Sequence, residues 1–278
     1  MKVLLVFGTR PEAIKLAPVI RELKIARAQQ EGSVAVPAAP GGAPTVRVCV
    51  TAQHREMLDQ VLRLFDITPD HDLHVMESNQ TPTQVASAVL ARLEPILAVE
   101  RPDWVVVQGD TTTVAAAAIA AFYARARVAH VEAGLRTRDK WQPFPEEMNR
   151  RVAGAVADLH LAATEGARSN LLAEGVPPDR ILVTGNPVID ALQWAAAMPP
   201  TPEVQALLRQ AGVGAEQERS RGAEGGRPCP LARPLPGCCS SRRTAGRISA
   251  HRWSRSAWRS ARSPIGMPAA CGYCTRCT

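Results

Sequence analysis

Short apolar runs alternate with segments of helical periodicity from the first residue to about residue 198. The runs VLLVFG (3–8), WVVVQG (104–109) and VAHVEA (128–133) are almost continuously apolar, which is typical of strands covered by helices on both faces. Regular alternation of such strands with helices indicates βαβ units. The pattern therefore predicts an α/β fold, a Rossmann-like, doubly wound parallel sheet.

The same pattern sets the expected element boundaries. The predicted strands are residues 3–8, 46–52, 72–76, 104–109, 128–133, 159–164 and 181–185. The predicted helices follow them near 14–23, at 54–65, at 83–99, up to Phe122, and at 146–157, 165–174 and 187–198. We expect residues 1–185 to form the Rossmann-like domain and residues 186–215 to be a helical link into an incomplete second domain.

Residues 216–278 form an irregular, arginine-rich tail. They contain only four Leu, Ile, Val or Phe residues, too few for a core, and 12 Arg but no Lys. A shifted reading frame in GC-rich DNA would give this mixture, and we favour that interpretation over a disordered basic tail. The CGYC segment at 271–274 has zinc-ligand spacing, but no second properly spaced pair accompanies it, so we expect no metal.

The net charge of +7 suggests a nucleic-acid or membrane-surface binder until its position is considered. The tail holds 12 of the 33 basic residues and three of the 26 acidic ones, which leaves the first 215 residues nearly neutral. Those residues contain one cysteine, Cys49, which fits a reducing cytosol. With no apolar run long enough for a membrane helix or a signal peptide, we expect a cytoplasmic protein without nucleic-acid or membrane partners.

Polar motifs follow the predicted strands at the sheet edge where parallel α/β folds bind ligands. In FGTRPEAIK (7–15), Arg10 and Lys15 lie near a helix start, where cations oppose the helix dipole. An anionic ligand would explain them, although a solvated helix start would also be compatible. In QGDTTT (108–113), Asp110 follows a strand; an N-cap role would also explain it.

A third carboxylate closes the strand of HVEAGLRT (130–137). A buried Glu132 needs a partner, and Arg136, Arg138 and Lys140 are the nearby candidates.

The motif PFPEEMNR (143–150) begins a helix. It places Glu146 in the first turn, where the dipole favours an acid, and spacing predicts an ion pair between Glu146 and Arg150.

Together the four motifs bring carboxylates and cations to one sheet edge. The cations suit a diphosphate, and carboxylates close to charges acquire the shifted pKa values that proton transfer requires. A sugar nucleotide that loses or exchanges a carbon-bound proton fits both features. The chain has no G-x-G-x-x-G after its first strand, no Walker lysine loop and no serine nucleophile elbow, so we expect no cofactor.

Six segments in order, over about residues 1–200, closely resemble the non-hydrolysing UDP-N-acetylglucosamine 2-epimerases. They are FGTRPEAIKLAPVI, TAQHREMLDQVL, QGDTTT, HVEAGLRT, PFPEEMNR and VTGNPVIDAL. The resemblance implies the N-terminal half of a glycosyltransferase-B-like fold in an isomerase of cell-surface polysaccharide biosynthesis. It implies conversion of UDP-N-acetylglucosamine to UDP-N-acetylmannosamine: the C2 proton is lost, UDP is eliminated to leave a glycal, and UDP then re-adds. It also leaves a homodimer open.

The matching motif positions imply the site residues. Asp110, Glu132 and Glu146 match the catalytic carboxylates of the family, and Arg10, Lys15 and Arg150 match its substrate-binding cations. Gln53 and His54 match a segment that contacts a second, regulatory UDP-N-acetylglucosamine in some members.

The resemblance stops before the tail. The second domain of the family supplies most UDP contacts and a catalytic histidine, and His251 lacks that surrounding pattern. We therefore predict little or no epimerase activity for the chain as written. The alternatives are a non-catalytic UDP-sugar-binding fragment, a hydrolysing relative that releases free N-acetylmannosamine, and a nucleic-acid binder acting through the tail, which we disfavour.

Overall fold

A computed structural model describes residues 1–31, 44–51, 55–75, 77 and 79–210 of the chain. Gln53, His54 and the tail at 216–278 lie outside the described residues, so the expectations for them stay predictions. Within the described part, no helix has the length and apolarity needed to cross a membrane.

A seven-stranded sheet organises the chain, and all of its strand pairs are parallel. The strand order is β3-β2-β1-β4-β5-β6-β7. The strands are β1 (Lys2–Phe7), β2 (Thr45–Val50), β3 (His71–Asp72), β4 (Trp104–Gln108), β5 (Arg127–Ala133), β6 (Leu159–Ala162) and β7 (Ile181–Val183). The predicted doubly wound α/β sheet is confirmed.

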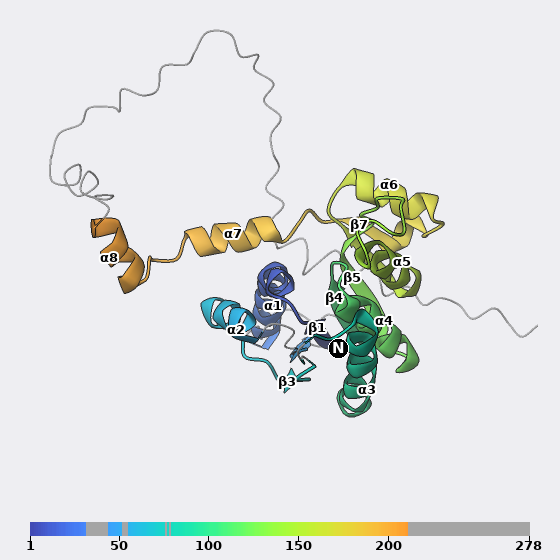
Figure 1. Cartoon of the computed structure of the whole chain (residues 1–278), viewed down its shortest axis with the longest axis horizontal. Coiled ribbons are helices and arrows are strands. Elements are labelled where there is room, and N and C mark those ends of the chain that lie inside the picture. Colours follow the sequence, from blue (N-terminus) through green and yellow to red (C-terminus); the bar gives the residue numbers. More distant parts are fainter. Residues whose placement is uncertain (32–43, 52–54, 76, 78, 211–278) are drawn as a thin grey trace, which may run out of the picture. The chain divides into compact units, whose positions relative to one another are not determined.

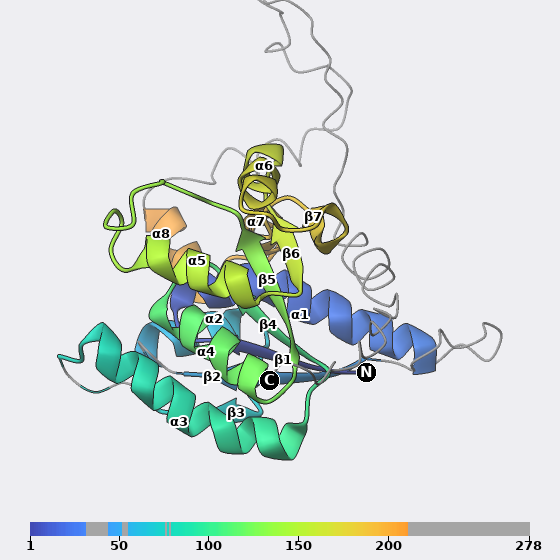
Figure 2. The same cartoon turned by 90° about the vertical axis from the view of Figure 1, so that its right-hand side faces the viewer.

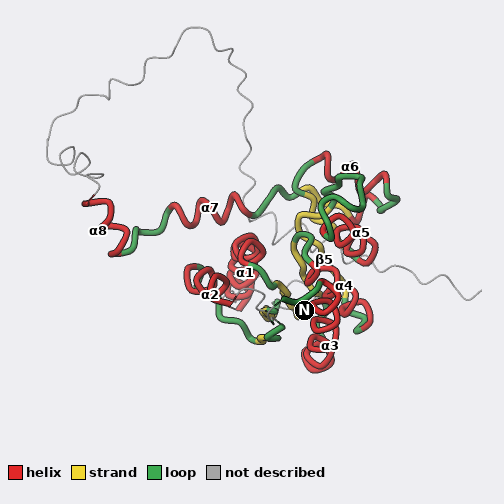
Figure 3. The backbone as a smooth tube through the Cα atoms, viewed as in Figure 1, coloured by secondary structure: helices red, strands yellow, loops and turns green. Residues whose placement is uncertain are grey.

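The described residues form eight α-helices. They are α1 (Arg10–Glu31), α2 (Arg55–Leu64), α3 (Pro82–Glu100), α4 (Thr112–Tyr123), α5 (Glu146–Val156), α6 (Glu165–Ala173), α7 (Val188–Ala196) and α8 (Pro202–Gln210). Helices α1 and α2 pack together on one side of the sheet, and α3, α4 and α5 lie side by side on the other (Figures 1 and 2). Figure 3 shows the strands between these two groups of helices.

The core follows from this layering. Val3 to Phe7 of β1 are fully buried, as the continuous apolar run predicts for a central strand. Ala115 to Ala118 of α4 are also buried; their small side chains let α4 fit closely between α3 and α5. The core therefore holds β1 and β4 rigidly, and the loops that leave their carboxyl ends start from fixed points.

The third strand is shorter than its sequence predicts. Apolar residues at 72–76 predicted a five-residue strand, but pairing with β2 covers only His71 and Asp72. His74 has a left-handed backbone with φ of 46°, and its backbone N–H donates to the Asp72 carboxylate, so the regular ladder ends there. The N–H groups of Leu73 and Val75 still donate to the carbonyl oxygens of Val50 and Thr51. A local side-chain hydrogen bond thus competes with the strand ladder.

The contacts among the described residues divide the chain into two compact units, one running from Met1 to Ala191 and the other beginning at Leu192. The described part of the first unit contains the whole sheet. The described part of the second unit contains the end of α7 and α8. The expected boundary at residue 185 and the helical link at 186–215 remain predictions.

Candidate active site

A cavity of about 410 Å³ opens at the carboxyl ends of the central strands. In the strand order, β1 and β4 are neighbours although their connections run in opposite directions, and such a switch point is where open α/β sheets bind ligands. The lining residues come from the loops after β1, β4 and β5 and from the helices that follow: Thr9, Pro11, Glu12, Lys15, Gln108, Gly109, Asp110, Thr111, Glu132, Leu135 and Arg150.

Glu132 reaches the cavity because β5 is irregular there. The pairing of β5 with β6 shifts register between Val131 and Ala133, and Glu132 has a left-handed backbone with φ of 63°. Such bulges re-aim a side chain, and a non-glycine residue in this region costs on the order of 1–2 kcal/mol. The surrounding sheet therefore keeps the backbone of Glu132 in a strained conformation at the point where its side chain meets the cavity.

Three side chains bind the Glu132 carboxylate. Lys15 Nζ and Gln108 Nε2 each donate to Oε2 at 2.5 Å, and Asn186 Nδ2 donates to Oε1 at 2.7 Å. The prediction that Arg136, Arg138 or Lys140 would pair with Glu132 is wrong.

Arg136 instead forms a two-pronged ion pair with Glu174. The prediction assumed a partner close in sequence, but the cation that contacts Glu132 is Lys15, which lies 117 residues away on α1.

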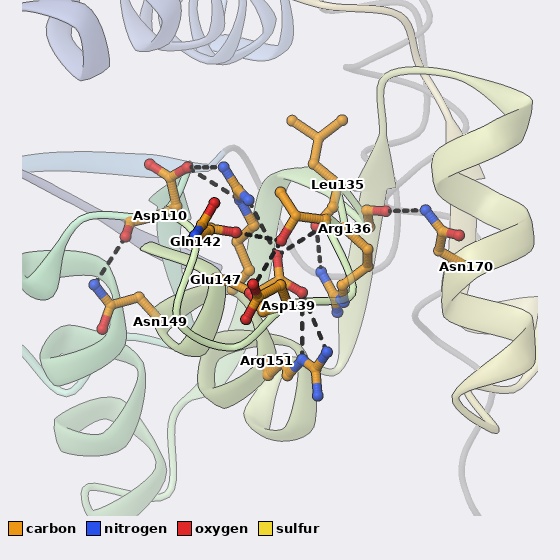
Figure 4. Close-up of polar contacts among 12 residues, drawn as sticks. Asp110, Leu135, Arg136, Asp139, Gln142, Glu147, Asn149, Arg151 and Asn170 are labelled. Carbon is orange, nitrogen blue, oxygen red and sulfur yellow. Dashed lines mark hydrogen bonds and ion pairs between the residues drawn. The ribbon is translucent and has the colours of Figure 1, made fainter. Parts of the chain in front are cut away.

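Asp110 is held by Arg150. The guanidinium Nε and Nη2 donate to Asp110 Oδ2 at 3.0 and 2.7 Å. Asn149 Nδ2 donates to the Asp110 carbonyl oxygen (Figure 4). The N-cap of α4 is Thr111 rather than Asp110, which leaves the Asp110 carboxylate for the cavity.

The predicted ion pair between Glu146 and Arg150 is also wrong. Arg150 Nη1 donates to Glu147 Oε2 at 3.1 Å, one turn away. Glu147 is completely buried, whereas Glu146 is half-buried and its Oε2 has no hydrogen-bond partner among the described residues. Of the two adjacent acids, Glu147 points towards Arg150.

A further buried carboxylate, Glu12, links the two central loops. Glu12 Oε2 accepts hydrogen bonds from the backbone N–H groups of Gly8 and Thr9, and its Oε1 accepts one from the Thr111 hydroxyl at 2.6 Å. Burial raises the pKa of Glu12, although these three donors oppose the rise. Glu12 therefore fixes the loop after β1 against the start of α4.

His130 forms a hydrogen bond with Gly109, a residue that lines the cavity. It is fully buried on β5, and its Nε2–H donates to the Gly109 carbonyl oxygen at 2.7 Å. Burial lowers the pKa of His130 to about 4, so the ring is neutral and its Nδ1 has no partner among the described residues. In register beside it on β6 lies His160, whose pKa burial likewise lowers to about 4.

The structure brings four of the predicted site residues to one cavity: Lys15, Asp110, Glu132 and Arg150. Arg10 is exposed at the first residue of α1, and neither Arg10 nor Glu146 is among the lining residues.

The residues that sequence reasoning missed are Glu12, Gln108, Asn186 and Glu147. Gln108 and Asn186 carried a signal, since each is a polar amide at the end of an apolar strand run.

The site combines charge pairs with helix ends. The first turn of α1 and the N-cap of α4, Thr111, line the cavity, and helix N-termini attract anions. Lys15 and Arg150 add positive charge, each paired with a carboxylate. Such an arrangement can bind an anionic group, and it also presents two fixed carboxylates, Asp110 and Glu132, that can transfer protons.

Comparison with known proteins shows the family of this chain. Residues 42–218 match the family model described as UDP-N-acetylglucosamine 2-epimerase. A putative UDP-N-acetylglucosamine 2-epimerase of Clostridium acetobutylicum is 54% identical over 192 residues, which are 69% of this chain and 46% of the relative. The UDP-N-acetylglucosamine 2-epimerase of Escherichia coli K12 is 53% identical over 194 residues, covering 70% of this chain and 48% of the relative.

Solved structures give the same result. The Neisseria meningitidis UDP-GlcNAc 2-epimerase bound to UDP-GlcNAc matches with a TM-score of 0.63 and 44% identity, over 79% of this chain and 54% of that one. The Methanocaldococcus jannaschii enzyme in complex with UDP-GlcNAc and UDP matches with a TM-score of 0.65 and 34% identity, over 76% and 54%. The chain spans about half the length of the curated relatives it matches. It belongs to the UDP-N-acetylglucosamine 2-epimerase family.

Proposed function

We propose that this chain supplies one half of a UDP-N-acetylglucosamine 2-epimerase active site and binds UDP-N-acetylglucosamine there, in the cytoplasm. The observation that carries the proposal is the pair of carboxylate–cation contacts, Glu132 with Lys15 and Asp110 with Arg150, that line one cavity. The cavity volume falls in the range of small-molecule sites. Two of the matched structures contain the same sugar nucleotide.

The proposed reaction removes a proton from C2 of the sugar and later returns a proton to the opposite face. A carboxylate takes the C2 proton of the sugar, the C1–O bond breaks with its electron pair leaving on UDP, and a C1=C2 double bond forms. Return of UDP and of a proton on the opposite face gives the epimer. Asp110 and Glu132 are the carboxylates that the cavity presents for these proton transfers, while Lys15, Arg150 and the starts of α1 and α4 stabilise the negative charge of the diphosphate.

Removing the Lys15 charge is expected to weaken binding. Lys15→Ala should raise the Kd for UDP-N-acetylglucosamine about 10- to 100-fold, because a hydrogen bond to a charged group contributes roughly 1.5–3 kcal/mol. Isothermal titration calorimetry on the full chain measures this. Lys24→Ala, which removes an exposed lysine of the same helix that does not line the cavity, is the matched control and should bind normally. Equal affinity for Lys15→Ala and Lys24→Ala would contradict the proposal.

Turnover is expected to be absent or very slow. No counterpart of the second domain of the family, with its histidine, is recognised in residues 216–278, so proton exchange should not be completed. The chain is incubated with UDP-N-acetylglucosamine in D2O and the C2 position is followed by proton NMR. We expect binding without deuterium at C2. Deuterium appearing there at the rate of an epimerase would show that the printed chain is sufficient for proton exchange.

A further inference from the structure

We propose that Glu147 is a positioning residue: its buried carboxylate orients Arg150 on Asp110 and anchors the loop after β5 at the same point. The inference rests on the proposed function, since it assigns Glu147 to the UDP-sugar site. Glu147 does not line the cavity, so it would act only through Arg150 and the loop.

The guanidinium of Arg150 has a carboxylate on each of two sides. Its Nε and Nη2 donate to Asp110, and its Nη1 donates to Glu147 Oε2. A planar guanidinium held on two sides has one orientation, whereas a long side chain held on one side keeps much of its freedom. Glu147 therefore fixes the plane in which Arg150 meets Asp110 and the cavity.

The same Glu147 oxygen anchors the loop between β5 and α5. The Thr137 backbone N–H donates to Glu147 Oε2 at 3.1 Å, and the Thr137 hydroxyl shares its one hydrogen between the carbonyl oxygens of Asp139 and Gln142. Figure 4 shows Asp139 and Gln142 beside Glu147. This loop begins just after Leu135, which lines the cavity. One carboxylate thus couples the loop after β5 to the Asp110 loop after β4.

A simpler role for Glu147 is a first-turn acid paired with Arg151 along the helix surface. Arg151 Nε and Nη2 lie 3.3 Å from Glu147 Oε1, and the Arg151 side chain is 41% exposed. An ion pair on an exposed helix surface contributes little stability and does not require the carboxylate to be buried. The Glu147 side chain is 0% exposed, and burying a charge is unfavourable unless donors compensate it. Burial raises the pKa of Glu147, but the hydrogen bonds from Thr137, Arg150 and Arg151 outweigh that effect and hold the pKa below its usual value.

The Arg150 Nε–H signal reports how Arg150 meets Asp110, because Nε donates to Asp110 while Nη1 donates to Glu147. In a ¹⁵N-labelled full chain, the Arg150 Nε–H resonance is identified by its loss in Arg150→Lys. In Glu147→Gln we expect it to shift towards the position of free arginine and to exchange with water about tenfold faster or more, because a charge-assisted anchor is gone. Arg151→Ala is the matched control: it removes another Glu147 partner but no contact to Asp110, and should leave the signal in place.

An unchanged Arg150 signal in folded Glu147→Gln would overturn the proposal. Should Glu147→Gln fail to fold by circular dichroism, Glu147→Asp, which keeps the charge but shortens its reach, must show the same direction of shift. Calorimetry separates this inference from the proposed function. Glu147→Gln should bind UDP-N-acetylglucosamine about tenfold more weakly than Arg151→Ala; equal affinities would remove Glu147 from the site. If the unaltered chain does not bind the ligand, the proposed function fails, while the Arg150 signal still decides the positioning role.

Discussion

Replacing Gly134 with alanine is expected to lower the Tm by about 10 °C, because roughly 3 kcal/mol of the free energy of unfolding is lost in a unit of this size. Gly134 has φ of 86°, and an added Cβ would lie 2.3 Å from the Ala167 carbonyl oxygen and 2.8 Å from its carbon. These are backbone atoms of α6, which cannot rotate away. Backbone strain and overpacking therefore add.

The matched control is Gly175→Ala. Gly175 has the same φ of 86°, but an added Cβ meets nothing within 4 Å. Only backbone strain remains in this variant, so we expect its free energy of unfolding to fall by about 1 kcal/mol. Thermal unfolding followed by circular dichroism compares the two variants. Equal Tm values would show that the contact between the loop after β5 and α6 is not as close as described. Because Gly134 lies two residues after Glu132, its variant should also weaken UDP-N-acetylglucosamine binding.

The second large effect is loss of stability in mild acid through the buried histidines of β5 and β6. The folded-state pKa of His130 is about 4, below its ordinary value of 6.5. Below pH 6.5 the unfolded chain therefore binds a proton that the folded chain resists, and stability falls as the pH drops from 6.5 towards 4. For His130 alone the free energy of unfolding should fall by about 2 kcal/mol between pH 7 and pH 5. His160 is expected to add a loss in the same direction.

Urea unfolding at the two pH values tests this effect. His130→Gln can still donate to the Gly109 carbonyl but does not titrate, so its stability should depend less on pH than that of the unaltered chain. The same pH dependence in His130→Gln and the unaltered chain would refute the role of His130.

The layers of the fold and the sheet edge that carries the site could be predicted from the sequence. Continuous apolar strands and regular alternation are local properties, and parallel connections bring every strand end to one edge, so Lys15, Asp110 and Glu132 could be assigned to that edge from the sequence. The motif positions also led to Arg150.

Which charged side chains pair could not be predicted from the sequence and depends on the assembled fold. The bulge at Glu132 is a property of two strands in register, and no pattern along one strand encodes it. Lys15 reaches Glu132 across 117 residues, and Glu147 rather than Glu146 meets Arg150 because the direction of each side chain depends on how α5 packs on the sheet. Hydrophobic periodicity fixes the faces of helices and strands, whereas contacts of a few ångströms between polar atoms depend on the distances between elements, which arise only when the core is assembled.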